Sequence, residues 1–364
     1  MRLMWRLSLV VALCAGILAS VLSCTKKPTK PKENPGLRLY ISDVVASCIY
    51  AIDPDVDSVL DSLPDVDVLW MEISPDGKWL YGLNARRTAQ SLLKIDTRTM
   101  EIAARREIVG GGGLALVDGG ATLFRAAGGL LEFIDPETWE VRDTASLTLR
   151  DLASADTVSF VIGVSAPYVT CYNYLQKRVI SAVGPFGIPG RPSAVIGDLS
   201  LHPSGKFGYG VIRDTPYEGW FVAFDTPSLA IKYIYPLSYD WGRAEPSPDG
   251  RYVLVTDPGP VMAPPTITGH FFVFDVAANQ IVKIVDTDTL TLLEETERPA
   301  AVGEIVYSPD GAVAYISTGA GGSAQGPVLV FDMGKLEFVQ CIRAPLRPPR
   351  QGVAAYDIAV GPEP

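Results

Sequence analysis

The sequence predicts an all-β fold built from seven repeats of four antiparallel strands, and three observations carry that prediction. A Pro-Asp-Gly or Pro-Ser-Gly turn recurs, as at Pro75–Gly77. An apolar residue followed by Asp or Asn recurs later in each repeat, and alternating apolar stretches lie between these markers. Proline presets φ at the second turn position, and glycine supplies the left-handed residue that a tight hairpin needs.

The second marker counts the repeats. It falls at Asp53, Asp96, Asp135, Asn173, Asp225, Asp275 and Asp332. Successive markers are 38 to 57 residues apart, which brackets the roughly 40–50 residues of a propeller blade and is too long for a leucine-rich repeat. The sequence therefore predicts a seven-bladed β-propeller of four-stranded antiparallel blades over residues 37–364.

The two ends of that region predict how the ring closes. Arg38–Ser42 leads to Asp53 with only two strands, so the first blade lacks its innermost strand. Ala355–Glu363 has the pattern of the strand and turn that are missing. We therefore expect the C-terminal strand to join the N-terminal blade, which leaves no free inner edge.

Three segments carry the clearest copies of the repeat: Pro75–Asn84, Pro248–Thr256 and Pro309–Ser317. They resemble the YVTN-type β-propeller repeats. The resemblance covers most of residues 37–364, well in repeats 2, 5, 6 and 7 and poorly in repeats 3 and 4. It implies a propeller scaffold but not an activity, because that family includes surface proteins, binding proteins and lactonase-like enzymes.

The N-terminus has the pattern of an export signal. Arg2 and Arg6 precede an apolar run that ends in Val21-Leu-Ser-Cys24. This ending resembles the bacterial lipobox, which implies a signal peptide over residues 1–23, cleavage before Cys24 and acylation of that cysteine. An uncleaved anchor and a plain secretory signal are the alternatives. Thr25, where an Asp would retain a lipoprotein at the inner membrane, favours the outer membrane if the cell is Gram-negative.

Residues 24–36 read as a lipid-anchored tether rich in proline and lysine. They contain three prolines and four lysines and no apolar period, as expected for a stiff, solvated spacer. The expected location is therefore the cell envelope, with the propeller either periplasmic or exposed at the surface. The membrane is the expected partner through Cys24.

The net charge of the chain narrows the range of expected partners. The chain has 31 basic and 41 acidic residues and a formal net charge of −10, so it repels phosphate backbones and disfavours nucleic acid as a partner.

Cys48, Cys171 and Cys341 each lie inside a predicted strand. We expect them to be buried small hydrophobic residues; if any pair forms a disulfide, Cys48 with Cys341 is favoured, because the first and last blades would be neighbours.

The sequence contains no recognisable catalytic or metal-binding set. His202 stands before a turn proline, where a structural role is expected. His270 follows a long loop and could act as a base at a loop-lined mouth, but no serine or carboxylate partner is identifiable from spacing, so a Ser-His-Asp or His-metal enzyme is unsupported. Asp53–Asp57 resembles the start of a calcium loop, yet Ser58 and Pro64 stand where that loop needs Gly and Glu. We predict neither a metal nor a cofactor.

Long connections fall on one predicted face of the ring, all in repeats 4 to 7. Those between second and third strands are 213–219, 257–269 and 319–326, and those between blades are 184–197, 237–243, 286–303 and 344–352. Aromatic residues accompany them: Phe186, Tyr217, Trp220, Tyr239 and Trp241. Aromatic side chains on loops over a rigid scaffold suit a binding surface, although loops that pack on one another would explain them equally well.

Polar residues recur on the predicted inner strands, five positions before each turn proline or its equivalent. These positions hold Trp70, Gly112, Arg150, Asp198, Arg243, Glu304 and Asp357, with Glu72 and Glu245 two residues further on, on the same side of the pleat. Arg150 and Arg243 could clamp the carboxylate or phosphate of a small polar or anionic ligand. Glu245, Glu304 or Asp357 could act as an acid or base. Alternatively, the charges pair with each other around a water-filled channel.

The sequence therefore favours a non-catalytic binding module whose loop-rich face takes a protein, a glycan or a small polar ligand. The residues expected to contribute are Arg150, Asp198, Arg243, Glu245, Glu304, Asp357, Trp220, Trp241 and His270. A lactonase-like hydrolase or isomerase at the channel mouth is the alternative. A structural subunit of an envelope assembly is a third reading.

Overall fold

A computed structural model of the chain describes residues 36–84, 90–110, 112–149, 151–165, 168–184, 195–215, 218–237, 242–257, 269–293, 302–318, 326–344 and 355–363. From Leu37 onward the chain forms one compact unit. The predicted signal peptide, Cys24 and almost all of the predicted tether lie outside the described residues.

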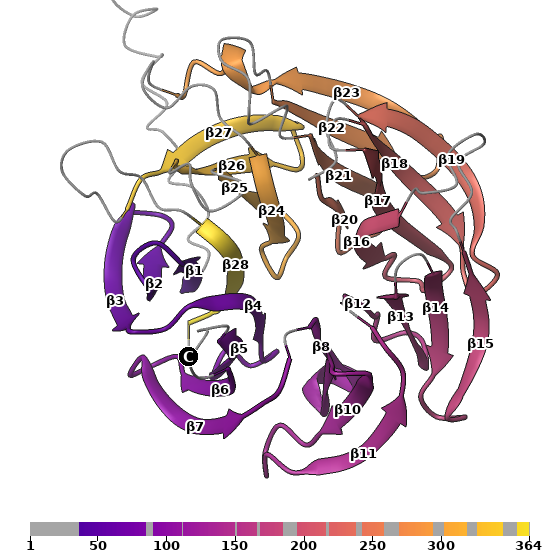
Figure 1. The fold of residues 1–364 in the computed structure, drawn as a ribbon. Helices are drawn as coiled ribbons and strands as arrows, with labels where there is room; N and C mark the ends of the chain where they lie inside the picture. The colour runs from indigo at the N-terminus through magenta and orange to yellow at the C-terminus, as the bar shows by residue number, and fades with distance from the viewer. Residues whose placement is uncertain are drawn as a thin grey trace, which may run out of the picture. The chain divides into compact units, whose positions relative to one another are not determined.

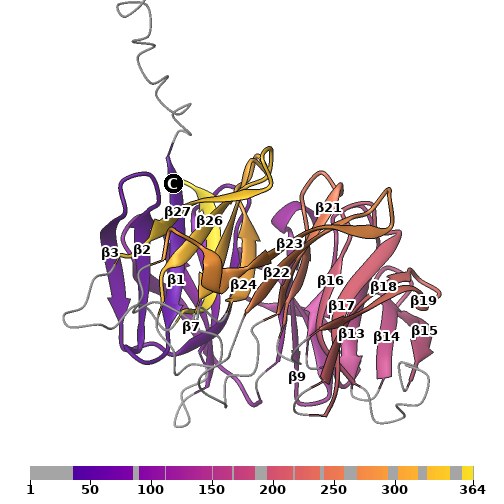
Figure 2. The same ribbon diagram turned by 90° about the horizontal axis from the view of Figure 1, so that it is seen from above.

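In the described chain, seven four-stranded antiparallel sheets stand around a central axis (Figure 1). In Figure 2, the same ring is turned by 90° and the strands run between its two faces. The predicted seven-bladed β-propeller is thus confirmed. Among the described residues no helix is both long and apolar enough to cross a membrane.

The blades follow the order of the chain, innermost strand first, except that the first blade begins with the last strand. Blade 1 consists of β28 (Ala355–Pro362), β1 (Leu37–Asp43), β2 (Cys48–Asp53) and β3 (Ser58–Pro64). Blade 2 consists of β4 (Val68–Ile73), β5 (Trp79–Asn84), β6 (Ser91–Asp96) and β7 (Glu101–Glu107). Blade 3 consists of β8 (Leu114–Val117), β9 (Thr122–Ala127), β10 (Leu130–Ile134) and β11 (Val141–Ser146), with the short 3-10 helix η1 (Asp118–Gly120).

The other four blades repeat this plan. Blade 4 consists of β12 (Leu152–Ala153), β13 (Phe160–Ser165), β14 (Tyr168–Asn173) and β15 (Arg178–Val183). Blade 5 consists of β16 (Val195–Leu201), β17 (Phe207–Thr215), β18 (Glu218–Asp225) and β19 (Ala230–Leu237). Blade 6 consists of β20 (Ala244–Pro246), β21 (Tyr252–Asp257), β22 (His270–Asp275) and β23 (Gln280–Asp286), followed by the 3-10 helix η2 (Thr287–Thr289). Blade 7 consists of β24 (Val302–Tyr307), β25 (Val313–Thr318), β26 (Val328–Asp332) and β27 (Glu337–Ile342).

The ring closes as the sequence predicts. β28 pairs with β1 in antiparallel register, with Leu39 opposite Val360 and Ile41 opposite Ile358. The first blade is therefore built from both ends of the propeller region. Its innermost strand comes from the last residues of the chain, so β1 has a paired strand on each side.

The turn between the first two strands of a blade explains why Pro-Asp-Gly recurs. Gly77, Gly205, Gly250 and Gly311 all have φ between 65° and 72°, a left-handed conformation that residues with a Cβ adopt at a cost. At Gly77 space is also lacking, because a Cβ there would lie 2.4 Å from the carbonyl oxygen of Pro362. The turn of blade 2 thus rests directly on the end of β28 in blade 1.

The Asp or Asn at the end of each third strand also recurs for a local reason. The Asp96 carboxylate accepts hydrogen bonds from the backbone amides of Arg98 and Thr99 at 2.9 and 3.2 Å. Asp53 and Asp332 make the same contacts with the two turns that follow them. Such side chains stabilise the hairpin from the third to the fourth strand.

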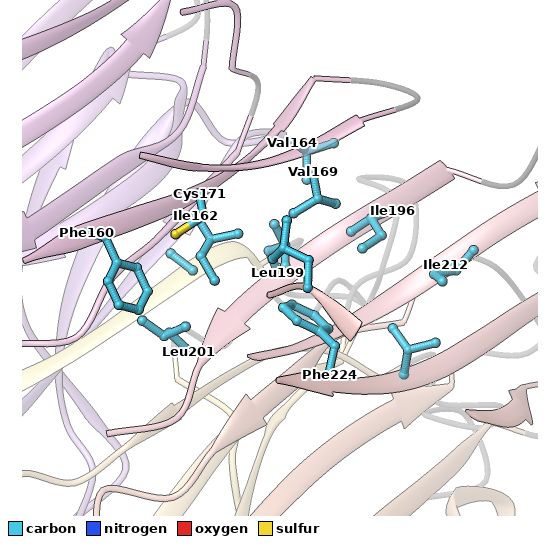
Figure 3. Close-up of a cluster of buried hydrophobic side chains, with 13 residues drawn as sticks. Phe160, Ile162, Val164, Val169, Cys171, Ile196, Leu199, Leu201, Ile212 and Phe224 are labelled. Carbon is cyan, nitrogen blue, oxygen red and sulfur yellow. The ribbon is translucent and has the colours of Figure 1, made fainter. Parts of the chain in front are cut away.

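The apolar core lies between neighbouring blades. Third strands such as β6 are buried on both faces, whereas fourth strands such as β7 alternate between exposed and half-buried residues. Figure 3 shows one of these interfaces, in which Phe160 and Ile162 of blade 4 meet Leu201 and Phe224 of blade 5. Each blade therefore buries apolar side chains against the next, which couples the stability of neighbouring blades.

The three cysteines are buried, as predicted. Cys171 has no exposed surface, and Cys48 and Cys341 are 6% and 8% exposed. Each is present as a thiol rather than a disulfide. Cys48 and Cys341 contribute to two different apolar clusters.

Candidate functional site

Six carboxylates from six blades converge near the axis of the ring. They belong to Glu72 (β4), Asp151 (directly before β12), Asp198 (β16), Glu245 (β20), Glu304 (β24) and Asp357 (β28). Together with Arg243, which directly precedes β20, they form what we call the axial cluster. Each keeps some surface accessible to water while protein surrounds it.

Backbone irregularities on the inner strands help to place these side chains. The register between first and second strands shifts between Ile196 and Asp198 in blade 5 and between Val302 and Ile305 in blade 7. A β-bulge of this kind re-aims the side chains that follow it. The position five residues before the turn proline lies at such an irregularity in both blades, which accounts for the polar ring that the sequence pattern predicts.

Arg243 is held between two neighbouring blades. Its Nε donates to Oε1 of Glu304 in blade 7 at 2.5 Å, and its Nη1 donates to Oδ1 of Asp198 in blade 5 at 3.1 Å. The guanidinium is therefore already engaged by two carboxylates. These contacts use two of the five N–H donors of the guanidinium, so the clamping of an anionic ligand by Arg243 stays a prediction. Arg150, the other half of the expected clamp, lies outside the described residues.

Two carboxylates of the axial cluster also bind backbone amides of the next blade. Asp198 Oδ2 accepts from the Ala244 N–H at 3.0 Å, and Asp357 Oδ2 accepts from the Met71 N–H at 2.5 Å. Ala244 and Met71 occupy equivalent places, four residues before their turn prolines. Asp198 and Asp357 therefore join the inner strands of adjacent blades, which is a structural role.

Most carboxylates of the axial cluster, Asp357 included, have raised pKa values, chiefly because they are buried. Burial raises the pKa of Glu72 to about 8. The pKa of Asp151 rises to about 7, chiefly through burial and then through the nearby Asp198, while Arg243 opposes the change. Burial, followed by the charges of Asp198 and Glu304, raises the pKa of Glu245 well above its usual range. Six carboxylates around one described guanidinium cannot all stay ionised, so some of them hold protons near neutral pH.

His270 lies apart from the axial cluster. It is the first residue of β22 and stands opposite Asp257, the last residue of β21. The distance between His270 Nδ1 and Asp257 Oδ2 is 3.9 Å, and the Asp257 side chain is fully buried. The structure thus supplies the carboxylate neighbour that sequence spacing could not identify.

Trp220 differs from its expected place. The sequence pattern groups it with a predicted loop over residues 213–219, but β17 continues to Thr215 and β18 begins at Glu218, so Trp220 lies within a strand. Its side chain is partly buried against the apolar cluster between blades 4 and 5. The pairing of β17 with β18 continues to Thr215 opposite Glu218, where the loop was expected. Trp241 lies outside the described residues.

The contacts of His202, the metal-binding capacity and the position of Asp151 can each be compared with the sequence predictions. His202 makes structural contacts: its Nε2 lies 2.9 Å from the Gly250 carbonyl oxygen of the next blade. In the described part of the chain, no group of three or more His, Cys, Asp or Glu side chains is placed to hold a metal ion. Asp151 escaped the sequence pattern because its blade carries the degraded turn Ala155-Asp-Thr157, which obscures the count along the inner strand.

The fold and its axial cluster define a seven-bladed β-propeller. Most of the charged side chains at its axis bind groups on a neighbouring blade. No protein-family model and no curated protein sequence matches the chain, so the relationship to the YVTN-type repeats stays a prediction.

Solved structures do resemble it. A functionally unknown protein from Desulfotomaculum acetoxidans has a TM-score of 0.64 and 14% identity, covering 90% of this chain and 99% of that one. Hydrazine synthase from Kuenenia stuttgartiensis has a TM-score of 0.58 and 14% identity, covering 74% of this chain and 77% of that one. Dihydro-heme d1 dehydrogenase NirN in complex with DHE has a TM-score of 0.54 and 13% identity, covering 87% and 76%. At such identities the likeness shows the fold alone.

Proposed function

We propose that this protein is a binding module whose loop-rich face takes a protein, glycan or small-molecule ligand. One observation carries the proposal. The ends of β21 and β22, and of β25 and β26, lie on the same side of the ring as the strand ends from which the connections between blades 4 to 7 leave. Connections concentrated over a rigid scaffold are the usual way in which this kind of fold presents contact residues.

The chemistry of the axis supports binding over catalysis. Arg243, Asp198 and Glu304 form an ion-pair network across three blades, and Asp198 and Asp357 bind backbone amides. Groups engaged in this way hold the ring together. The structures that resemble this fold have different activities, among them a hydrazine synthase and a dehydrogenase, so the scaffold itself does not identify an activity.

We further propose that the chain is exported and anchored to the cell envelope through lipid on Cys24. The support is the sequence pattern around Val21–Cys24. Mass spectrometry of the N-terminal peptide from the native host tests this: an acylated Cys24 as the first residue supports it, and an unmodified peptide that continues through Ser23 contradicts it.

The binding proposal is tested on the full chain with two matched variants. One replaces residues 258–268 by a short Gly-Ser linker on the loop-rich face, and the other is Val56→Ser, an exposed residue on the opposite face that is 66% exposed. A partner enriched from envelope extract is purified and its Kd measured. The proposal expects the linker variant to bind about tenfold more weakly and Val56→Ser to bind normally; equal binding by all three proteins contradicts it.

A specific observation keeps the hydrolase alternative in view: carboxyl groups with pKa values of about 7 (Asp151) and about 8 (Glu72) are in the range of a general acid or base. A lactone-hydrolysis screen tests it. Activity that is lost in Asp151→Asn and Glu72→Gln supports chemistry at the axis, whereas activity retained in both variants removes the axial cluster as its site. Co-purification with a fixed partner and no ligand response would instead indicate a structural subunit.

A further inference from the structure

A cavity of about 370 Å³ lies between blades 5 and 6, at the end of the strands that faces the loop-rich side. Its described lining comes from the end of β19 and from β21, β22 and β23. The residues that matter most are Tyr235, Leu237, Asp257, His270, Phe272 and Ile284. The cavity is separate from the axial cluster, because none of its lining residues belongs to an innermost strand.

The walls of the cavity are of mixed polarity, with the aromatic rings of Tyr235 and Phe272 beside the polar side chains of Asp257 and His270. Phe272 is 4% exposed, and its ring meets the Tyr235 ring edge-on, with centroids 5.4 Å apart and an angle of 63° between the planes. Buried Leu237 adds to the floor, and Ile284, which is 54% exposed, stands at the rim. Aromatic surfaces in this arrangement favour a flat ring that can stack or meet them edge-on.

His270 contributes an imidazole ring to the lining of the cavity. Its Nδ1 is buried, makes no hydrogen bond within the described chain, and lies 3.9 Å from Asp257 Oδ2. The side chain is nevertheless 29% exposed, so the accessible part of the ring is the other edge, which carries Nε2. The charged and titratable groups around the imidazole are Asp257 from β21, Asp286 opposite on β23, and Tyr235 from β19.

The neighbouring carboxylate decides which nitrogen carries the proton in the neutral ring. A carboxylate beside Nδ1 favours the tautomer with the proton on Nδ1, and the lone pair of Nε2 then remains as an acceptor. A ligand that fits the cavity therefore offers an aromatic ring to Tyr235 and Phe272 and an O–H donor to His270 Nε2.

We propose that this cavity is a binding site for a small phenolic ring, with His270 Nε2 accepting the phenol hydrogen and Asp257 fixing the tautomer. This inference rests on the proposed function, since it names the ligand class for one part of the loop-rich face. It assigns Asp257 a positioning role, because the buried carboxylate acts on the ligand only through the imidazole.

The presence of only two histidines makes the test direct. The imidazole nitrogen resonances of the full chain are followed by NMR during titration with 4-methylphenol. The matched ligand is 4-methylanisole, which keeps the ring and lacks the O–H. His202 is the internal control, since its two nitrogens already contact Ser204 and Gly250.

The expected result is a saturable shift of the His270 resonances only, about five- to tenfold weaker binding of 4-methylanisole, and loss of binding in His270→Gln. In the ligand-free protein, Asp257→Asn should move the His270 tautomer toward Nε2–H, a readout that a merely structural role would not produce. Equal affinity for both ligands, tighter binding of benzoate, or shifts at His202 alone would overturn the proposal. Partner capture that depends on the loop-rich face would leave the proposed function standing in any of these cases.

Discussion

The Asp357 carboxylate in blade 1 accepts the backbone hydrogen of Met71 in blade 2 at 2.5 Å. The two residues are 286 positions apart in the chain, so this hydrogen bond joins the last strand to the second blade. Asp198 and Ala244 repeat the contact between blades 5 and 6.

Removing this acceptor should weaken the ring. Asp357→Ala leaves the Met71 amide without its partner and is expected to lower the free energy of unfolding by on the order of 1–3 kcal/mol. Asp357→Asn should cost less, because it keeps an acceptor oxygen. Urea unfolding provides the measurement, with exposed Asp61→Ala on β3 as the control. An alanine variant as stable as the control would contradict a structural role for Asp357.

Glu72 should make stability fall as pH rises. Burial raises its folded pKa to about 8, above the roughly 4.3 of an unfolded glutamate. The folded state therefore binds more protons between these values, and stability decreases through that window. Glu72→Gln should flatten the profile and, near pH 8, stabilise the protein by on the order of 1–3 kcal/mol.

Thermal unfolding at about pH 5 and pH 8 measures this effect. The control is Glu101→Gln, an exposed glutamate on the outermost strand β7, which should leave the slope unchanged. If Glu72→Gln and wild type show the same difference between the two pH values, the burial assigned to Glu72 is wrong.

Arg243 should be far more important for stability than a surface arginine. Arg243→Met leaves Glu304 and Asp198 without their counter-charge in a partly buried place and should cost on the order of 3 kcal/mol. Arg142, which pairs with Asp135 but is 53% exposed, is the matched control, and Arg142→Met should cost under about 1 kcal/mol.

The cost of Arg243→Met should also shrink at lower pH. Burial raises the pKa of Glu304 and Arg243 lowers it, so without the guanidinium Glu304 takes up a proton more readily in the folded state and the variant gains stability relative to wild type as pH falls. Denaturant unfolding of both variants at about pH 5 and pH 8 checks this. A similar, pH-independent cost for Arg142→Met and Arg243→Met would show that the axial ion pairs contribute little.

Removing the strand β28 should destabilise the whole ring. Deleting residues 355–364 removes β28 and with it the buried side chains of Ile358 and Val360, so cooperative unfolding is expected to be lost. Removing only residues 363–364 deletes the Arg38–Glu363 pair, which spans 3.5 Å at the surface, and should change little. Circular dichroism on heating separates the cases, and a longer truncation that melts like wild type would refute closure by β28.

The three propeller cysteines should resist modification in the folded protein. Cys171 has no exposed surface, and burial raises the pKa of its thiol to about 12, so little reactive thiolate forms near pH 8. Iodoacetamide labelling followed by peptide mapping should find Cys48, Cys171 and Cys341 protected until denaturant is added. Rapid labelling of Cys171 in the native state would contradict its burial.

The repeat itself could be predicted from sequence because its signals are local. Gly77 needs a positive φ, and Asp96 caps the turn that follows it, so each leaves its mark within a few residues. Ring closure could be predicted by counting the strands that precede Asp53. These features depend on the backbone of one hairpin at a time, which is why they remain legible in a single chain.

The site could be predicted only in part, because its geometry depends on contacts between blades. The residue pattern found the inner positions of Arg243 and Glu304 but not that they bind each other across two blades. Asp257 and His270 are brought together by strand register on either side of a long loop, and spacing along the sequence does not encode that register. Trp220 lies within a strand rather than in a loop-rich region because the pairing of β17 with β18 continues to Thr215 and Glu218, which the local sequence does not encode.

The pairing of β28 with β1 sets the order in which the molecule can be completed. A ribosome makes Leu37–Asp43 before Ala355–Pro362, so β1 waits through the synthesis of six further blades with one edge uncovered. Until β28 emerges, that edge is open to mispairing, and the arrival of β28 closes the ring.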